Sequence, residues 1–340
     1  MNNTTEPSPS VAPEEFVGEV AVACVILGLS FLVGAPGNLL VIWTILRHVK
    51  QRSHTVVLIL HLAAADLLVL ITLPIWIYSL ADTWVFGVAL CKTLGYVINA
   101  CMYSSIFFIT LMSVERYLAI CRPFVMMRWK TKSTVNRCLL LFWLLAFLLG
   151  MPALSGTTGE TNGTEQCLYR EYTSKTQEIM FLCMEILVGF VIPFTVLSVC
   201  YSLVAVQLKK MRFNSKQKSM VLIHAVVIAF TVCWLPYHII NIINLDCRLG
   251  SDIGHECLPQ SVTLGSGALA FISSSVNPVL YAFLSRSFRG NMEDSKLVRL
   301  FREVTAQTNK LMDLSAQQAT NQGTAHTQQE LVCIHTRNVR

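Results

Sequence analysis

Charged residues are scarce in this chain. Only 14% of its 340 residues are Asp, Glu, Lys or Arg, whereas 54% are hydrophobic. A soluble globular domain carries about 25% charged residues, so the composition excludes a soluble domain and predicts an integral membrane protein. The net charge of +6 does not indicate a nucleic-acid partner, because the basic residues cluster in a few loops between apolar segments.

The chain also lacks the patterns of several other protein classes. Residues 1–19 are polar and acidic without a basic n-region, so we expect the first apolar run to act as an uncleaved anchor rather than as a signal peptide. The chain has no His/Glu metal spacing and no nucleophile elbow, and His61 and His224 are solitary, so we do not expect an enzyme. The inverted repeats and paired broken helices of transporters are missing too, which leaves a transporter or channel as a weak alternative.

Long apolar segments are abundant. Seven of them have about twenty or more mostly apolar residues, the length that a helix needs to cross a bilayer. They lie at 20–46, 54–80, 88–121, 135–156, 178–208, 218–245 and 260–284. The sequence therefore predicts an all-α membrane protein, with a seven-helix transmembrane bundle over residues 20–284.

The loops predict the orientation of the bundle. Basic residues without any Asp or Glu fill the loops after the first, third and fifth segments: Arg47, Lys50, Arg52; Arg122, Arg128, Lys130, Lys132, Arg137; Lys209, Lys210, Arg212, Lys216, Lys218. Basic loops stay in the cytoplasm, so the N-terminus lies outside the plasma membrane. The Asn-x-Ser/Thr sequons at Asn2, Asn3 and Asn162 fall on the predicted outer side, which makes residues 1–19 a glycosylated extracellular segment.

Two further segments follow the last span. In residues 285–302, Phe288, Leu297, Leu300 and Phe301 alternate with Arg and Lys, a pattern typical of a short amphipathic helix on the inner membrane surface. Residues 303–340 are rich in Gln, Thr and Asn and are expected to form a disordered cytoplasmic tail.

The twelve cysteines do not form a disulfide scaffold. Most lie within or at the edge of apolar segments, where they are small buried residues. Cys91 and Cys167 both lie on the predicted outer side, where disulfides persist, and a bond between them would tie the long loop before the fifth span to the top of the third. Cys247 and Cys257 flank a short outer loop, and a second bridge there is as reasonable as two free thiols.

An ordered set of motifs runs through the seven segments. It consists of Gly37-Asn38, Leu62-Ala63-x-x-Asp66, Cys91 with Glu115-Arg116-Tyr117, Trp143, Pro193 with Tyr201, Cys233-Trp234-Leu235-Pro236, and Asn277-Pro278-x-x-Tyr281. This set resembles that of the class A (rhodopsin-like) G-protein-coupled receptors over about residues 20–302. The small departure is Glu115, where Asp is more common.

Within the class, the chain is most similar to the leukotriene B4 receptors. The resembling stretches are 60–66, Met102-Tyr103-x-Ser105, Arg122-Pro123-Phe124, Trp234-Leu235-Pro236-Tyr237-His238 with Asn241, and 273–278. The resemblance implies a receptor for a lipid chemoattractant in chemotaxis and inflammatory responses, acting through inhibitory-class heterotrimeric G proteins. Arrestin, receptor kinases and membrane lipids are the other implied partners. A chemoattractant peptide is the alternative ligand, favoured by the acidic outer loops.

The class pattern also implies the switch residues: Glu115, Arg116, Tyr117, Tyr201, Asn277, Pro278 and Tyr281. Glu115 would hold Arg116 at rest and release it toward Tyr201 and Tyr281 on activation.

A sodium site is implied as well. Asp66, Ser105, Ser273 and Asn277, with Asn38 nearby, would enclose a hydrated sodium ion, since oxygen ligands suit a hard cation. The alternative is a protonated, hydrogen-bonded Asp66. No other cofactor is expected.

The outer half of the bundle holds the candidate ligand residues. They are Tyr96, Asn99, Met102, Tyr103, Glu185, Trp234, Tyr237, His238 and Asn241, and they combine an apolar body with scattered polar groups, as a hydroxylated lipid requires. Ile98 stands where amine receptors have Asp, which argues against a biogenic amine.

The chain departs from the leukotriene receptors at the positions expected to bind the ligand carboxylate. A carboxylate needs a cation or strong hydrogen-bond donors. Positions that tend to be basic in the leukotriene receptors are Gly95, Gly156, Glu178 and Thr263 here. The remaining candidates are Lys92, Arg170, Lys175 and Arg248.

Overall fold

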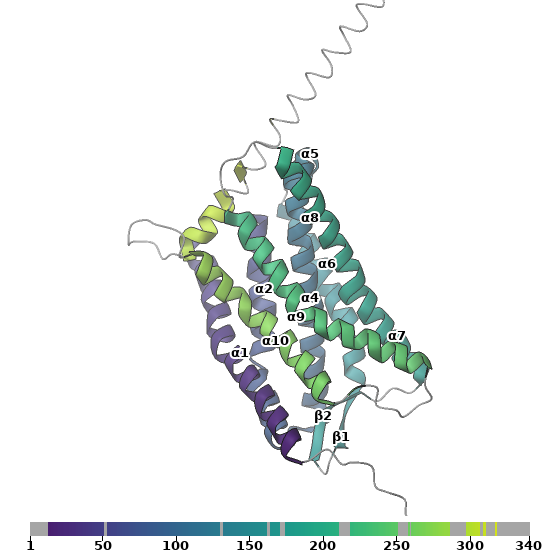
Figure 1. Ribbon diagram of the computed structural model, residues 1–340. Coiled ribbons are helices and arrows are strands. Elements are labelled where there is room, and N and C mark those ends of the chain that lie inside the picture. The colour runs from purple at the N-terminus through teal and green to yellow at the C-terminus, as the bar shows by residue number, and fades with distance from the viewer. Residues whose placement is uncertain are drawn as a thin grey trace, which may run out of the picture.

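Long helices lying side by side form the body of the protein (Figure 1). The computed structural model describes residues 13–50, 53–129, 132–161, 164–170, 174–210, 218–250, 258, 260–285, 297–306, 309–310 and 317. The helices are α1 (Pro13–His48), α2 (His54–Leu70), α3 (Leu73–Ala81), α4 (Gly87–Cys121), α5 (Pro123–Trp129), α6 (Lys132–Gly150), α7 (Lys175–Ile186), α8 (Ile192–Lys210), α9 (Lys218–Gly250) and α10 (Gln260–Ser285).

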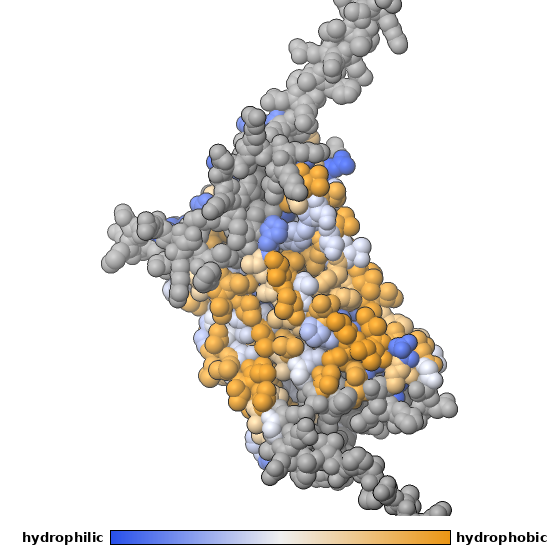
Figure 2. Space-filling model, in the orientation of Figure 1, coloured by the Kyte–Doolittle hydropathy of each residue, from blue (hydrophilic) through white to orange (hydrophobic). Residues whose placement is uncertain are grey.

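Seven rods built from these helices confirm the predicted seven-helix bundle. Six stretches of the described chain are long and apolar enough to cross a bilayer: Val20–His48, His54–Ala81, Gly87–Cys121, Thr134–Ser155, Lys175–Gln207 and Val227–Gly250. Helix α10 packs between α1 and α9 and forms the seventh rod. The coloured part of the face seen in Figure 2 is largely apolar, and side chains such as Leu32 and Val232 are about two-thirds exposed, at 67% and 65%. Such a surface is stable facing lipid rather than water.

The second span is broken near its middle. Helix α2 ends at Leu70 and α3 begins at Leu73, with Pro74 in its first turn. Proline has no N–H and is tolerated at the first turn of a helix, so the break falls just before it. At the break, the Thr72 backbone N–H and the Thr72 hydroxyl both donate to the carbonyl of Val69, at 3.0 and 2.7 Å. The second span is therefore interrupted immediately before Pro74.

The fifth span contains a turn of π-helix. Leu187–Val191 form this turn between α7 and α8, two residues before Pro193. A π-turn inserts one extra residue into an α-helix and is a common response to a disrupted hydrogen-bond ladder. No motif in the sequence predicted this π-turn.

The fourth span changes from α-helix to 3₁₀ helix near its end. Helix α6 ends at Gly150, a 3₁₀ turn covers Met151–Ser155, and an antiparallel hairpin of β1 (Gly156–Thr161) and β2 (Thr164–Arg170) follows. We call this end of the bundle the hairpin end, and the opposite end, where α5 lies, the α5 end (Figure 1). The fourth span reaches Ser155, within one residue of the predicted end at residue 156, but its last residues are 3₁₀ rather than α, and the hairpin was not predicted.

A disulfide fastens the hairpin to the bundle. Cys91 near the start of α4 is bonded to Cys167 of β2, as predicted. Trp76 and Trp84 pack around this bond with ring centroids 5.7 Å apart. The indole of Trp84 donates to the carbonyl of Gly87 at 2.9 Å, and Gly87 has a φ of 75°, a conformation that favours glycine. The loop between α3 and α4 is thereby fixed.

Among the other cysteines, the predicted burial holds for Cys101, Cys200 and Cys233, whereas Cys24, Cys121, Cys138 and Cys183 are partly exposed. Cys24, Cys101, Cys121, Cys138, Cys183, Cys200 and Cys233 are free thiols. Cys247 is disulfide-bonded. Its predicted partner Cys257 lies outside the described residues, as do the sequons at Asn2, Asn3 and Asn162, so the second pairing and the glycosylation stay predictions.

Residues 297–306 form a helical segment after the last span. Leu300 and Phe301 are fully buried and join the main hydrophobic core, where the ring of Phe301 lies 5.9 Å from that of Tyr281. The segment extends beyond the predicted boundary at residue 302, because Val304 is also buried in this core. Phe288 lies outside the described residues, and contact with the membrane surface stays a prediction.

Candidate functional site

A buried carboxyl lies in the centre of the bundle. Asp66 of α2 is 2% exposed, and the Asn277 side-chain amide on α10 donates to its Oδ2 at 2.8 Å. The hydroxyls of Ser105 and Ser274 also interact with this carboxyl. A carboxyl at this depth in a membrane protein is costly unless it has partners, and it usually marks a functional site. The structure thus brings Asp66, Ser105 and Asn277 together, as predicted.

Ser273 has different partners from those expected. Its hydroxyl donates to the carbonyl of Ala270 at 2.7 Å and accepts from the Trp234 indole at 3.1 Å. Consecutive helical residues point about 100° apart, so Ser274, which the sequence analysis missed, reaches Asp66 while Ser273 reaches α9. Ser273 therefore links the central polar group to the tryptophan of the sixth span.

Asn38 completes the central polar group. It is fully buried, and its side-chain amide donates to the carbonyls of Gly34 and Ser274, each at 2.9 Å. Its Oδ1 has no hydrogen-bond partner among the described residues. The close approach of α1 and α10 depends on glycine here, since a Cβ at Gly37 would lie 2.8 Å from Pro278.

Near the α5 end, a threonine connects the predicted switch residues. The Thr55 hydroxyl on α2 donates to Glu115 Oε2 at 2.7 Å and accepts from Arg116 Nη2 at 2.5 Å. All three residues are buried, and Arg116 is 0% exposed. Charged groups in this environment need hydrogen-bonded partners. The sequence predicted the Glu115–Arg116 pair, but no motif pointed to Thr55.

The other predicted switch residues lie on neighbouring helices. Tyr201 of α8 accepts a hydrogen bond from Ser113 at 3.3 Å and packs against His224 at a ring distance of 4.7 Å. Tyr281 is 1% exposed, and its hydroxyl has no hydrogen-bond partner among the described residues. Tyr117 is half-buried. Arg116 is thus bonded toward α2, while the two tyrosines that it is predicted to approach lie on α8 and α10.

Toward the hairpin end, α7 and α9 share a cluster of aromatic and polar side chains. The Tyr237 hydroxyl donates a short hydrogen bond to the Glu185 carboxylate. The His238 ring lies 5.4 Å from that of Tyr237 and 6.1 Å from that of Trp234. Four of the nine predicted ligand residues are therefore in one group.

His238 is held in an unusual environment. It is 0% exposed, and neither ring nitrogen has a hydrogen-bond partner among the described residues. Phe190 stacks on it at 5.0 Å, and a Cβ at Gly189 would lie 3.2 Å from its ring. Both residues belong to the π-turn, which composition alone does not reveal. Asn241, one turn further along α9, also has a buried amide nitrogen without a partner in the described chain.

The predicted residues of α4 are more dispersed. Met102 and Tyr103 are buried in the core. Asn99 donates to the carbonyl of Gly95 in its own helix at 2.9 Å. The ring of Tyr96 stacks on that of Phe147 at 6.3 Å, and Phe147 is itself on the apolar outer surface. The ring contact of Tyr96 is therefore with α6.

An ion pair joins α7 and α9 closer to the hairpin end. Arg248 Nε lies 3.1 Å from Glu178 Oε1, and the two side chains are 31% and 22% exposed. Glu178 is the acidic residue at a position that tends to be basic in the leukotriene receptors. Arg248 is one of the candidate partners for the ligand carboxylate. Their pairing was not predicted.

Comparison with known proteins identifies the class. Residues 37–281 match the family model described as 7 transmembrane receptor (rhodopsin family). This match covers most of the chain and includes the buried Asp66–Asn277 pair and the Thr55–Glu115–Arg116 group.

Sequence identity to individual relatives shows which receptors of this family the chain is similar to. The chain is 37% identical to leukotriene B4 receptor 1 of Homo sapiens over 288 residues, which cover 83% of this chain and 81% of the relative. It is 38% identical to leukotriene B4 receptor 1 of Rattus norvegicus over 263 residues, or 76% and 75% of the two chains. Chemerin-like receptor 2 of Mus musculus is 33% identical over 293 residues, or 83% and 82%.

The chain therefore belongs to the rhodopsin family of seven-transmembrane, G-protein-coupled receptors. It is a multi-pass membrane protein that couples to a heterotrimeric G protein and is not an enzyme. It is related to both the leukotriene B4 receptors and the chemerin-like receptors.

The Thr55 bridge leads to a testable prediction. Replacing Thr55 with Val keeps the side-chain shape but leaves the Glu115 and Arg116 atoms without their shared partner. An unsatisfied buried polar group costs about 1–3 kcal/mol, so we expect Thr55→Val to lower the thermal unfolding temperature of the purified receptor.

Thr110→Val is the matched control for this experiment. Among the described residues, the Thr110 hydroxyl donates to the carbonyl of Ile106 in its own helix, at 2.8 Å, and has no hydrogen bond to another helix. An equal loss of stability in both variants would show that Thr55 has no special role as a bridge.

Proposed function

We propose that this receptor is activated by a lipid chemoattractant, leukotriene B4 or a related hydroxylated fatty acid, and that it signals through inhibitory-class G proteins. The main support is the similarity to leukotriene B4 receptors combined with the α7–α9 cluster. In that cluster, His238 and Asn241 present buried polar atoms without partners in the described chain, within a shell of aromatic rings. Such atoms gain most from a ligand hydroxyl in an otherwise apolar site.

In this proposal the N-terminus and the hairpin end lie outside the cell, and the α5 end faces the G protein. Arg116, bonded to Thr55, represents the resting arrangement, and activation turns it toward Tyr201 and Tyr281. Interaction with arrestin and receptor kinases and a role in chemotaxis belong to the same proposal.

A peptide or protein chemoattractant is the second candidate. It is favoured by the 33% identity to chemerin-like receptor 2 over most of the chain. The two candidates share the fold and the switch but differ in what the hairpin end must accommodate.

G-protein activation in transfected cells separates these candidates. We expect leukotriene B4 or a related hydroxylated fatty acid to give a saturable response that an inhibitor of inhibitory-class G proteins abolishes. The cells are also challenged with chemerin-derived and other chemoattractant peptides. A response to peptides alone would overturn the lipid assignment, and a response that resists the inhibitor would overturn the G-protein assignment.

A sodium ion near Asp66 forms part of the proposal. The residues present fit a hard cation, because the Asp66 carboxylate, the Ser105 hydroxyl and the partnerless Asn38 Oδ1 are buried oxygen donors at the centre of the bundle. Bound there, the ion would supply the positive charge that a buried carboxylate requires.

The substitution Asp66→Asn removes the buried negative charge that the sodium ion would balance, and so tests whether the ion binds there. In membranes with the wild-type receptor, we expect sodium to lower agonist affinity, since the ion stabilises the resting arrangement. In Asp66→Asn the affinity is expected to be the same in sodium and in N-methylglucamine buffers. A sodium effect that survives the substitution would place the ion elsewhere.

The ion pair at the hairpin end offers a partner for the ligand carboxylate. Arg248, one of the four candidate cations, lies against a carboxylate, that of Glu178. A fatty-acid carboxylate is chemically equivalent to Glu178 and could replace it on the guanidinium. Glu178 would then keep Arg248 in position and compete with the ligand.

Two substitutions of opposite expected effect test this exchange. Arg248→Gln is expected to weaken leukotriene B4 binding about tenfold or more, since hydrogen bonds to charged groups contribute about 1.5–3 kcal/mol. Glu178→Gln is expected to strengthen binding, because Arg248 loses its competing partner. The control ligand is the methyl ester of leukotriene B4, whose binding neither substitution should change. Equal effects on acid and ester would refute the exchange.

A further inference from the structure

A histidine packs against one of the switch tyrosines near the α5 end. The ring of His224 on α9 lies 4.7 Å from that of Tyr201 on α8, and the two ring planes are tilted by 50°. In the sequence His224 is solitary and belongs to no motif. The fold gives it a neighbour whose orientation matters for the switch, because a packed ring restricts the rotamers of the tyrosine beside it.

His224 lies where protons from the aqueous phase reach it. The residue is partly exposed, and it precedes Val227, where the apolar stretch of α9 begins. Histidine as a class changes its charge between about pH 5 and 8, close to physiological pH. The charge beside Tyr201 can therefore change with the pH on the α5 side of the membrane.

Tyr201 lies between this histidine and the switch residues of α4. Its hydroxyl is 3.3 Å from that of Ser113, and it interacts electrostatically with Arg116. In the proposed function Arg116 leaves Thr55 on activation and turns toward Tyr201. The ring contact with His224 holds Tyr201 toward α9 and so opposes this step.

A positive charge on His224 opposes activation in two ways. A cation within about 6 Å of the centre of a tyrosine ring is attracted to the ring, so protonation strengthens the contact with Tyr201. The same charge repels the Arg116 guanidinium, which has to approach Tyr201. The two effects have the same sign and favour the resting arrangement.

The other ionisable groups near this contact do not reverse the sign. Glu115 is the anionic residue among them, and its carboxylate is bonded to Thr55 at 2.7 Å, toward α2 rather than toward α9. The remaining titratable or cationic residues on the neighbouring helices and on α9 itself are Cys200, Arg116, Tyr281 and Lys218. None of these supplies a negative charge near neutral pH in its ordinary state that would cancel a charge on His224.

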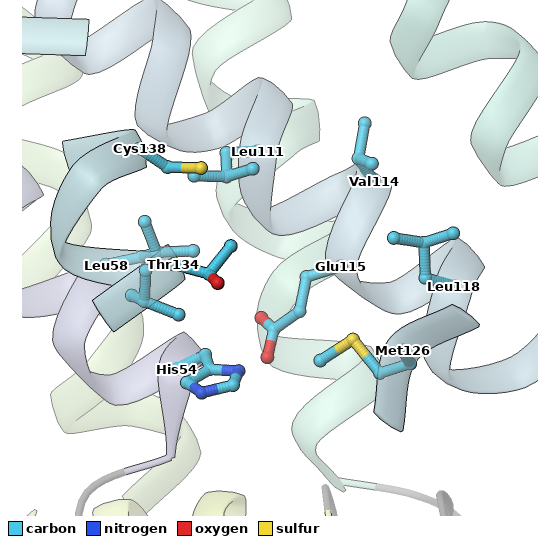
Figure 3. A pocket seen from close by; sticks show the side chains of 10 residues that line it. His54, Leu58, Leu111, Val114, Glu115, Leu118, Met126, Thr134 and Cys138 are labelled. Carbon is cyan, nitrogen blue, oxygen red and sulfur yellow. The ribbon is translucent and has the colours of Figure 1, made fainter. Parts of the chain in front are cut away.

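A second histidine at the α5 end would respond to pH with the opposite sign. His54 and Glu115 line one pocket between α2, α4, α5 and α6, and the His54 ring and the Glu115 carboxylate both point into it (Figure 3). A protonated His54 would attract the carboxylate away from Thr55 and so release Arg116. Acidification acting through His54 would therefore raise activation, which separates it from an effect of His224.

We propose that His224 is a positioning residue of the switch, which holds Tyr201 in the resting arrangement and holds it more strongly when protonated. Acidification on the α5 side then lowers agonist-independent activation of the G protein. A cation–π attraction of ordinary strength at a partly exposed site corresponds to about a two- to fivefold change. The effect on activation rests on the Arg116–Tyr201 step of the proposed function, whereas the protonation-dependent ring contact does not.

Nucleotide exchange tests the effect on activation. The full-length receptor in phospholipid nanodiscs is combined with the G protein identified in the activation experiment, and exchange is measured without agonist between about pH 8 and about pH 6. After subtraction of exchange by the G protein alone, we expect the wild type to fall about two- to fivefold on acidification. His224→Phe keeps a ring against Tyr201 but cannot be protonated, so its exchange should stay at the level of the wild type at high pH.

Further variants separate a charge effect from a packing effect. His224→Arg places a permanent cation that stacks on aromatic rings, so its exchange should be low at both pH values. His48→Gln is the matched control, because His48 ends α1 near the same end of the bundle and packs against Trp43 instead. It should keep the fall, and so should His54→Gln. If His224→Phe does not reach the membrane, His224→Gln removes the charge with a polar side chain.

Several results would overturn the proposal. A fall of normal size in His224→Phe or His224→Gln would show that another group titrates. A rise on acidification that disappears in His54→Gln would assign the pH dependence to the Glu115 side of the switch. High exchange by His224→Arg at both pH values would show that a cation at this position does not hold Tyr201.

Carbon-13 NMR tests the contact without a G protein. In receptor with labelled tyrosine, the Tyr201 resonance, assigned with Tyr201→Phe, should shift over the same pH range, and His224→Phe should abolish this shift. An equal shift in both proteins would refute the contact. A shift that requires His224 but leaves exchange unchanged would overturn the Arg116–Tyr201 step and keep the contact. Neither measurement uses leukotriene B4, so failure of the ligand assignment is recognised separately.

Discussion

The absence of water in the bilayer is the constraint on which this structure depends. Backbone groups in hydrocarbon must find their partners within the protein, so each span is helical and every interruption needs local compensation. At the break at Ile71–Thr72, the Thr72 N–H and hydroxyl both bond to the carbonyl of Val69, and the fifth span contains a π-turn next to Pro193. Loops and the β hairpin occur where the spans have ended. The same constraint makes buried polar side chains expensive, so those that persist indicate function.

The buried polar residues form separate groups along the bundle. Asp66 and Asn277 lie at the centre, Thr55 with Glu115 and Arg116 near one end, and Glu185 with Tyr237 near the other. The Trp234–Ser273 hydrogen bond joins α9, which carries part of the α7–α9 cluster, to α10, which carries Asn277. A change of side-chain conformation in the α7–α9 cluster can thus be transmitted to the Asp66–Asn277 pair through direct contacts between α9 and α10. This arrangement is a physical basis for signal transmission, while coupling itself requires measurement.

Most of the fold was predictable because a span has a strong and simple signal. Length and hydropathy located the seven helices to within a few residues, and the position of Cys91 and Cys167 on one predicted side indicated their bond. The hairpin at residues 156–170 was missed because its Gly, Thr and Glu residues carry no alternating apolar pattern. The Thr55 bridge and the exchange of Ser273 for Ser274 depend on helix rotation, which a motif does not specify. The Arg248–Glu178 pair depends on the relative placement of two loop-proximal helix ends.

The π-turn at Leu187–Val191 gives the fifth span an adjustable register. Such a turn contains one residue more than the α-helix needs, and each residue of an α-helix contributes about 100° of rotation and 1.5 Å of rise. If the extra residue were absorbed into regular helix, α7 would turn by about 100° relative to α8. Glu185 would then leave Tyr237, and Phe190 would leave the face of His238. The fifth span therefore has two alternative helix registers, which differ by a single residue.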